Sequence, residues 1–396
     1  MDILDKYYRG YCQINLDNIY ENIVNMKNNT SEGTGMVAVI KTDGYGHGAV
    51  PIAKKIDDIV DAYAVATIDE GINLRRHGID KPIYILGFTY EMRAKEAVDY
   101  DIRMAVFKYE TAVCADKAAK ELGKKAKIHI KLDTGMSRIG FKDNEASVEE
   151  ILKINQLENV EIEGIFTHFA CADEVDKTMT FNQIERFKKF INMLKEKGVN
   201  IPIKHCSNSA GIIDVREANF NETRIGISLY GLYPSEEVNK SNVILKPALE
   251  LKSHIIFIKN IDKGTTVSYG ATFKADKEMR IATIPIGYGD GYPRNLSNKG
   301  YVLINGSKAK ILGRVCMDQM MVDVTDIEAE EGDMVTLIGR DGDAFISAEE
   351  ISKLAGTFNY ELVCDLGKRI PRVYISDGKL VGGKDYFYDR YEITLN

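Results

Sequence analysis

The first residue of this sequence with an evident chemical use is a lysine that directly follows an apolar run. Residues 36–40 read Met-Val-Ala-Val-Ile, a composition typical of a strand buried on both faces, and Lys41 comes next. Burial lowers the pKa of a lysine, and the neutral amine can then attack a carbonyl compound such as pyridoxal phosphate (PLP). The alternative is that this lysine extends its charge into water.

A glycine-rich turn follows the lysine. Residues 42–48 read Thr-Asp-Gly-Tyr-Gly-His-Gly, which predicts a turn with a freely shaped backbone. Glycine lets a backbone approach a ligand closely, and this favours a binding role for Lys41 over simple exposure. The position of one lysine does not decide between the two interpretations, so the other polar residues must.

Polar side chains also lie at the ends of four later apolar runs. They are Lys131 and Arg138 at and after residues 127–133, His168 after 161–167, Asn208 and Ser209 after 201–206, and Arg224 within 223–229. Ser209 alone would suit a helix cap, and Arg224 alone an ordinary ion pair. His168 or His205 alone would suit a hydrogen-bonded core histidine. Their joint position at the ends of the runs is what indicates a site.

Eight apolar runs define the expected fold. They are residues 36–41, 61–66, 83–86, 103–107, 127–133, 161–167, 201–206 and 223–229. Between them, residues 145–156 and 181–197 carry apolar side chains at helical spacing. Eight strand–helix alternations predict an α/β fold, a (β/α)8 barrel of the TIM type, with functional residues at the C-terminal ends of its strands. A doubly wound open sheet is the alternative, but no GxGxxG follows the first strand.

The last two strands of such a barrel are followed by loops that often bind phosphate through backbone N–H groups. Asn208-Ser209 and Gly226-Ile227 supply these two loops. A phosphate there and a lysine on the first strand would match the two ends of PLP.

The pattern changes after about residue 245, where alternating, strand-rich sequence with short turns begins. We therefore expect a barrel domain at 12–244 and a mainly β domain at 245–396, with residues 1–11 as a candidate addition to the second. Tyrosines such as Tyr269 would ordinarily serve sheet packing, and the glycines would serve turns.

Composition limits the classes of function. Hydrophobic residues make up 44% and charged residues 28% of the 396, and the net charge of −7 gives no general attraction for nucleic acid or an anionic membrane. The N-terminus does not resemble a secretory signal, and no apolar run approaches the roughly 18 residues of a membrane span. Six cysteines without a CxxC pair and six histidines without HExxH predict a cytoplasmic protein without a metal site.

Three later stretches, residues 267–273, 284–294 and 313–319, join the Lys41 segment in a resemblance to alanine racemase. The resemblance extends from about residue 12 to Tyr374 and keeps the order of the motifs. It implies a PLP-binding barrel followed by a β domain, and a homodimer whose active sites take residues from both chains. The implied substrate is alanine.

The resemblance implies two catalytic bases. Lys41 matches the lysine that holds PLP and acts toward D-alanine, and Tyr269 matches the partner subunit's tyrosine that acts toward L-alanine. Racemisation needs bases on opposite faces of the α-carbon, because one removes a proton and the other returns one. A tyrosine with an ordinary pKa of about 10 can serve only if cationic neighbours stabilise its phenolate.

The other implied roles fall into three groups. The cofactor-binding positions are Lys41, Tyr45, His168, Asn208, Ser209, Arg224, Gly226 and Ile227, with Arg224 facing the pyridine nitrogen. The substrate-binding positions are Arg138, Met317 and Asp318. Lys131 matches a lysine that is carbamylated in many family members, where the resulting anion orients the arginine that Arg138 matches.

The sequence departs from the family pattern at Lys368, where members often have a tyrosine beside the substrate. A lysine can still bind phosphate as a point charge, but the aromatic wall is lost. The first hypothesis is thus an alanine racemase that supplies D-alanine for peptidoglycan. A serine or broad-specificity racemase is the second. A non-catalytic PLP-binding protein of the single-barrel type is the third, and the Tyr269 and Met317 stretches argue against it.

Overall fold

The computed structural model describes residues 6–388, and the chain divides into two units. The barrel unit comprises Ile19–Gly44 and Ala49–Lys246. The sheet unit comprises Met1–Asn18, Tyr45–Gly48 and Pro247–Asn396. Residues 1–5 and 389–396, which belong to the expected β domain and its N-terminal addition, lie outside the described residues.

Eight parallel strands close into a ring in the barrel unit. In chain order they are β2 (Gly35–Val39), β3 (Ala62–Val65), β4 (Ile83–Ile85), β5 (Ile102–Val106), β6 (Ala126–Asp133), β8 (Val160–Phe166), β9 (Ile203–His205) and β10 (Glu222–Ile225). Each pairs with the next, and β10 pairs with β2. The predicted (β/α)8 barrel is confirmed. The eighth run is shorter than expected, because after Ile225 the chain turns into the 3₁₀ helix η3 (Ile227–Tyr230).

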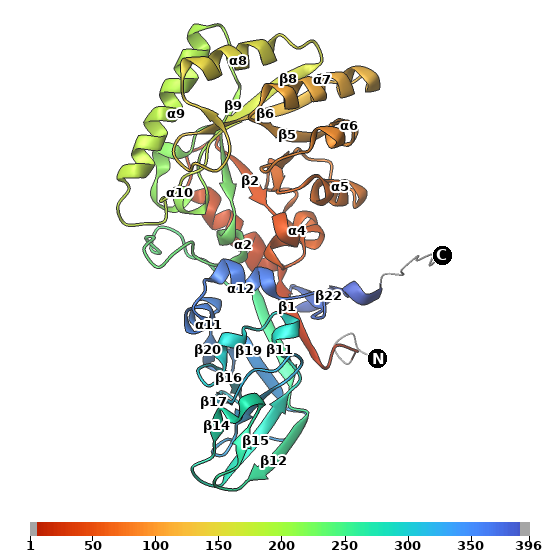
Figure 1. Cartoon of the computed structure of the whole chain (residues 1–396), viewed down its shortest axis with the longest axis vertical. Coiled ribbons are helices and arrows are strands. Elements are labelled where there is room, and N and C mark those ends of the chain that lie inside the picture. The colour runs from red at the N-terminus through yellow and green to blue at the C-terminus, as the bar shows by residue number, and fades with distance from the viewer. Residues whose placement is uncertain (1–5, 389–396) are drawn as a thin grey trace. The chain divides into compact units, whose positions relative to one another are not determined.

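Helices alternate with the barrel strands along the chain, and the first helix precedes β2 (Figure 1). They are α2 (Leu16–Asn28), α4 (Ala49–Ile56), α5 (Ile68–Arg76), α6 (Ala94–Asp99), α7 (Tyr109–Leu122), α8 (Glu145–Asn155), α9 (Thr178–Glu196) and α10 (Ser209–Asp214), with β7 (Phe141–Lys142), η1 (Glu91–Arg93) and η2 (Arg216–Ala218) between them. The apolar stripe of α9 buries Phe187, Phe190 and Leu194. Gly198, with φ of 83°, follows its end.

The sheet unit contains an eleven-stranded sheet with the path β12-β15-β18-β17-β16-β19-β11-β1-β21-β22, on which β20 pairs with β19. The strands are β1 (Gly10–Asn15), β11 (Leu249–His254), β12 (Phe257–Ile261), β15 (Met279–Ile284), β16 (Tyr301–Ile304), β17 (Ser307–Leu312), β18 (Met320–Asp323), β19 (Met334–Asp341), β20 (Ala344–Ile346), β21 (Arg372–Ser376) and β22 (Lys379–Lys384). Helices α11 (Ala348–Ala355) and α12 (Asn359–Asp365) precede β21, and the short η5 (Tyr288–Asp290), η6 (Arg294–Leu296) and η7 (Tyr386–Tyr388) complete the unit with a hairpin described below.

The first strand of the chain belongs to this sheet. β1 pairs with β11 in antiparallel and with β21 in parallel register, and Tyr7 and Tyr11 pack against Val373. The expected boundaries at 12 and 245 therefore differ from the units of the structure at the N-terminus, where the unit extends to Asn18. The domain ranges themselves stay a prediction.

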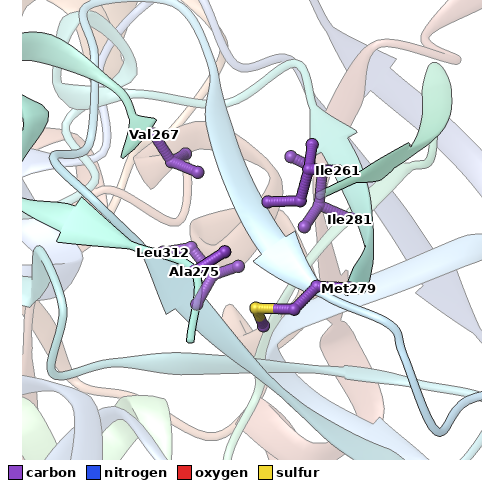
Figure 2. Packing of buried hydrophobic residues seen from close by; sticks show 6 residues of the cluster. All are labelled: Ile261, Val267, Ala275, Met279, Ile281 and Leu312. Atoms are coloured by element: carbon purple, nitrogen blue, oxygen red, sulfur yellow. The ribbon is translucent and has the colours of Figure 1, made fainter. Parts of the chain in front are cut away.

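A small hydrophobic cluster supports the hairpin that carries Tyr269. The hairpin consists of β13 (Thr266–Val267), η4 (Tyr269–Ala271) and β14 (Phe273–Lys274). Figure 2 shows the buried members of the cluster, which are Ile261, Val267, Ala275, Met279, Ile281 and Leu312. Phe273 packs against them from the second strand. Hydrophobic burial thus stabilises the base of the hairpin, whereas Tyr269 itself is 72% exposed.

Replacing Ile281 by alanine removes a buried side chain from this cluster. We expect the free energy of unfolding to fall by about 2–4 kcal/mol, because the lost burial adds to the cost of a cavity. Chemical denaturation of the full chain measures it. Lys310→Ala, at an exposed position of β17, is the matched control and should change stability by no more than about 0.5 kcal/mol. Equal effects of both changes would contradict a supporting role for the cluster.

Candidate active site

Lys41 stands at the junction between a buried strand and a left-handed turn. It begins the segment α3 (Lys41–Tyr45), in which Thr42, Asp43 and Gly44 have φ/ψ of 54°/44°, 50°/52° and 65°/44°, and Tyr45 has φ of 51°. Left-handed backbone costs a residue other than glycine roughly 1–2 kcal/mol. The predicted turn is present, but most of its strain falls on residues other than glycine.

Hydrogen bonds within the barrel unit hold this turn. The N–H of Gly44 donates to the carbonyl of Ile40 at 2.9 Å, and the N–H of Ala49 donates to Asp43 Oδ1 at 2.9 Å. The N–H of Thr42 donates to Glu70 Oε1 at 2.6 Å. These bonds offset the backbone strain and fix the position of Lys41.

Glu70 reaches this turn from the start of another helix. Its Oε2 accepts the N–H groups of Ala66 at 2.8 Å and Thr67 at 3.2 Å, as the return half of a capping box at the N-terminus of α5. One carboxylate therefore accepts three backbone N–H groups from two loops, of which one follows Lys41.

The segment Tyr45–Gly48 belongs to the sheet unit. A Cβ on Gly46 would lie 2.2 Å from the carbonyl oxygen of Val363, so only glycine allows this approach. Arg372, buried in β21, donates from Nε to the carbonyl of Gly46 at 2.8 Å. The ring of Tyr45 lies 6.2 Å from that of Tyr360. Tyr45 is therefore fixed by packing on the sheet unit.

Arg224 is buried in the barrel with only 2% of its surface exposed. Its Nη1 donates to Nδ1 and the carbonyl of His205 at 3.0 and 2.9 Å. Its Nη2 donates to the carbonyls of Thr167 and Cys206 at 2.9 and 3.0 Å and to Nδ1 of His168 at 3.3 Å. Burial lowers the pKa of Arg224 to about 10, which leaves it charged at neutral pH. Within residues 6–388, its Nε–H makes no hydrogen bond.

His168 is surrounded by positive charge. Burial, followed by the charges of Arg224, Arg138, Lys131 and Lys41, holds the pKa of His168 well below its ordinary value. The ring is therefore neutral. Because Arg224 donates to Nδ1, the imidazole proton must be on Nε2. His168 can thus donate one hydrogen bond from Nε2 to a group at the site.

Lys131 and Arg138 complete a cationic cluster in the barrel unit. Burial, and secondarily the charge of Arg224, lowers the pKa of Lys131 to about 8, and its Nζ donates to the carbonyl of Leu132 at 2.6 Å. Arg138 is exposed on the loop after β6 and makes no side-chain hydrogen bond or ion pair within the described residues. The cluster is suited to anionic ligands.

The loops after β9 and β10 meet in the barrel unit. Ser209 Oγ accepts the N–H groups of Gly226 at 2.9 Å and Ser228 at 3.3 Å. Asn208 caps α10 by accepting the N–H of Gly211 at 3.0 Å. Gly226 and Ile227 lie where β10 passes into η3. Asn208, Ser209, Gly226 and Ile227 are therefore close neighbours, which a shared phosphate contact requires.

Three predicted site residues lie in the sheet unit. Tyr269 projects from its hairpin, and Met317 is half-exposed on the loop before β18 with its carbonyl accepting the N–H of Gly289 at 2.8 Å. Asp318 pairs with Arg369 Nη1 at 2.7 Å, and Arg369 also lies 3.3 Å from the buried Asp290. Nearby, Lys368 is exposed.

The predicted residues therefore fall into two groups. In the barrel unit, the charges of Lys41, Lys131, Arg138 and Arg224 act on the imidazole of His168. The last two loops carry Asn208, Ser209, Gly226 and Ile227. Tyr45, Tyr269, Met317 and Asp318 belong to the sheet unit. Sequence reasoning missed Glu70, and it missed His129 and Glu163, which lie behind Arg224. His129 had a signal, because polar residues at 127, 129, 131 and 133 share one face of a strand.

A closed barrel with a lysine after its first strand and a cationic cluster at later strand ends defines a barrel enzyme that binds anionic ligands. The alanine racemase N-terminal domain model matches residues 14–234, and the alanine racemase C-terminal domain model matches residues 248–374. The chain belongs to the alanine racemase family.

Individual relatives cover almost the whole chain. The alanine racemase of Clostridium tetani is 46% identical over 379 residues, which are 95% of this chain and 98% of that protein. A solved alanine racemase of Clostridium difficile 630 is 44% identical with a TM-score of 0.92 and covers 96% of this chain and 98% of its own. The histidine racemase of Leuconostoc mesenteroides subsp. sake is 29% identical with a TM-score of 0.86, over 93% and 99%.

No helix within residues 6–388 is long and apolar enough to cross a membrane. In the same part of the chain, no three His, Cys, Asp or Glu side chains form a group that could hold a metal ion.

Replacing Glu70 by alanine removes the acceptor for Thr42, Ala66 and Thr67. We expect the free energy of unfolding to fall by about 1.5–3 kcal/mol, the usual worth of hydrogen bonds to a charged group. The stability of Glu70→Gln should lie between that of the wild type and that of Glu70→Ala, since glutamine keeps one acceptor oxygen. Asp69→Asn, beside it and paired with Arg93 at the surface, is the control and should cost less than about 1 kcal/mol. Denaturation curves of the four proteins decide the point.

Proposed function

We propose that this protein is an alanine racemase that binds PLP and interconverts L- and D-alanine. The single observation that carries the proposal is the charge pattern of the barrel site, in which the charges of four cationic side chains, Lys41 among them, act on one neutral histidine, His168. Such a site suits a ligand with a phosphate at one end and a carboxylate at the other. Family membership supports the same assignment.

The residues of the barrel unit fit PLP. Lys41 supplies the amine for the cofactor aldehyde, and the loops of Ser209 and Gly226 supply hydroxyl and backbone groups for the phosphate. Arg224 retains one N–H group, on Nε, beyond those it uses within the described residues. That group suits the pyridine nitrogen, which is an acceptor when unprotonated.

When bound, PLP supplies an electron sink for the electron pair left at the α-carbon. Lys41 Nζ removes or returns the α-proton on one face. The phenolate oxygen of Tyr269 of the partner subunit does the same on the opposite face. The neutral His168 donates from Nε2 to this phenolate and, with the nearby cations, lowers its pKa. Arg224 in turn holds His168 in the tautomer that can donate.

Arg138 and Lys131 act on the substrate carboxylate. The exposed guanidinium of Arg138 binds the carboxylate, and the backbone of Met317 contributes a further contact. Lys131 becomes carbamylated: the neutral Nζ attacks carbon dioxide, forms a C–N bond and releases one proton. The carbamate then replaces a buried cation by an anion and orients Arg138 through charge.

The wider role follows from the activity. The position of Tyr269 on the partner subunit implies a homodimer with shared active sites. The racemase activity implies a cytoplasmic enzyme that makes D-alanine for peptidoglycan. A non-catalytic PLP-binding protein of a single barrel is the weaker hypothesis, since the second family domain matches residues 248–374.

A broader amino-acid racemase is the second candidate. Its support is the exposed Lys368, which stands where many family members have an aromatic wall beside the substrate, and the similarity to a histidine racemase. The same experiment separates the two candidates when several amino acids are offered.

The test is proton NMR in D₂O of the protein with PLP and L-alanine, L-serine or L-histidine. We expect loss of the α-proton signal and D-product from alanine, much faster than from the others. Lys41→Ala should abolish both, and Tyr269→Phe should lower kcat/KM roughly 100- to 10,000-fold, because a general base is lost. Tyr90→Phe, a change at another exposed tyrosine, is the control.

The outcomes separate the hypotheses. Comparable rates on alanine and serine or histidine would establish the broader racemase. No exchange from any of them with PLP bound would sink both racemase proposals. An unchanged rate in Tyr269→Phe would remove the two-base assignment while leaving the activity.

Carbamylation of Lys131 has its own pH dependence. The pKa of Lys131 is lowered to about 8, so the reactive neutral amine grows as pH rises through this value and vanishes below it. In protein equilibrated with ¹³C-bicarbonate, a carbamate ¹³C signal should strengthen from pH 6 to about pH 9. Lys131→Arg cannot form it, because its guanidinium stays protonated. A signal that persists in Lys131→Arg would assign the carbamate to another residue.

A further inference from the structure

A line of hydrogen bonds runs from Arg224 into the barrel, away from the residues assigned above. Arg224 Nη1 donates to Nδ1 of His205, and Nε2 of His205 lies 2.9 Å from Nδ1 of His129. Nε2 of His129 lies 3.2 Å from Oε2 of Glu163. Four strands, β10, β9, β6 and β8, contribute one residue each. The proposed reaction uses none of the last three residues.

The order of protons along this line is determined. A guanidinium only donates, so Nδ1 of His205 must accept and its proton must be on Nε2. That proton is donated to Nδ1 of His129, whose own proton is then on Nε2 and is donated to Glu163. Burial, reinforced by the charges of Arg224, His129 and Lys131, keeps the pKa of His205 well below its ordinary value. Burial also lowers the pKa of His129, and both rings are neutral.

The surroundings are built for these two rings. A Cβ on Gly164 would lie 2.5 Å from Nδ1 of His129, so glycine is required to admit the imidazole. Phe166 stacks on His205 with centroids 4.9 Å apart and an interplanar angle of 14°, and Tyr84 packs on His129 at 4.3 Å. The rings therefore cannot reorient without disturbing the barrel core.

Charged groups at the far end keep Glu163 ionised. Arg103 donates from Nε to Glu163 at 3.0 Å and also pairs with Asp101, and Lys127 lies 3.5 Å from Glu163. Burial opposes the charge on Glu163, but hydrogen bonds from His129 and Arg103 outweigh it and lower its pKa to about 2. Close by, Glu222 accepts from Tyr84, and its own pKa is raised to about 7 by burial.

We propose that Glu163, His129 and His205 are positioning residues for Arg224, through which a partly buried carboxylate fixes Nδ1 of His205 as an acceptor and so holds the guanidinium toward the cofactor. This inference rests on the proposed PLP-dependent function. Within residues 6–388, no carboxylate bonds Arg224 directly, and Glu163 is the anion at the end of its hydrogen-bonded line. Hydrogen bonds in such a line polarise one another.

The carboxylate matters because it can only accept. An amide at position 163 can turn and donate to Nε2 of His129, which moves the His129 proton to Nδ1. That proton then opposes Nε2–H of His205, and relief by a proton shift in His205 would place Nδ1–H against Arg224. The guanidinium therefore keeps its hydrogen bond to Nδ1 of His205 only if position 163, at the other end of the line, also accepts a hydrogen bond.

The test compares Glu163→Gln with Lys127→Gln, which removes another neighbour of the same carboxylate. In cofactor-free full-length protein, ¹⁵N spectra of labelled histidine should show single Nε2–H tautomers for His129 and His205 in the wild type and in Lys127→Gln. Glu163→Gln should show mixed tautomers. When PLP is bound to Glu163→Gln, the visible absorption band of the cofactor should shift relative to the wild type. The kcat of this variant should fall about tenfold, with little change in KM.

Two changes at His129 provide the second comparison. His129→Gln keeps one acceptor and one donor and should restore most of the activity that His129→Leu loses. The double change Glu163→Gln with His129→Leu should be no worse than His129→Leu alone, because both break one line.

Unchanged tautomers and an unchanged absorption band in Glu163→Gln would overturn the proposal, as would additive losses in the double variant. A wild type that racemises no amino acid would count against the proposed function only. The tautomer measurement uses cofactor-free protein, so it tests the positioning role independently of racemase activity.

Discussion

The barrel site depends on one buried charge, the guanidinium of Arg224. Desolvating an ion costs several kcal/mol unless its donors are satisfied, and here three carbonyls and two imidazoles accept from its two Nη atoms. The carbonyls come from the ends of β8 and β9 and the residues that follow them. The register of these strands with β10 is therefore set both by barrel closure and by the need to satisfy a cation.

The buried guanidinium of Arg224 requires its two histidine partners to be neutral. His168 and His205 accept from Arg224, and a protonated imidazole cannot accept at the nitrogen that carries its proton. Desolvation by burial and the neighbouring cation Arg224 both disfavour their ionisation, so electrostatics and hydrogen bonding favour the same state. The site thereby obtains donors of fixed direction that do not titrate near neutral pH, which suits the proposed role of His168 toward a phenolate.

The fold was predictable from the sequence because apolar runs and helical spacing are local signals. The strands of the barrel, the helices at 145–155 and 178–196 and the change to β structure all follow from them. The cationic residues could be placed at strand ends by the barrel rule.

Two features could not be predicted. Thr42 and Asp43 adopt left-handed backbone with the help of the distant Glu70, which accepts the N–H of Thr42, and Tyr45–Gly48 joins the sheet unit through contacts made hundreds of residues later. Such constraints are non-local, so neither propensity nor spacing records them.

The barrel site carries an excess of positive charge, which anionic ligands can offset. Lys41, Lys131, Arg138 and Arg224 all act on the same imidazole, and like charges gathered in a partly buried site repel one another. The protein tolerates this arrangement because the lowered pKa of Lys131 lets one charge be lost and the remaining ones can meet anions. The proposed phosphate, substrate carboxylate and carbamate would each relieve part of the repulsion. Because such ligands favour the folded state, the binding free energy of the proposed cofactor also stabilises the barrel against unfolding.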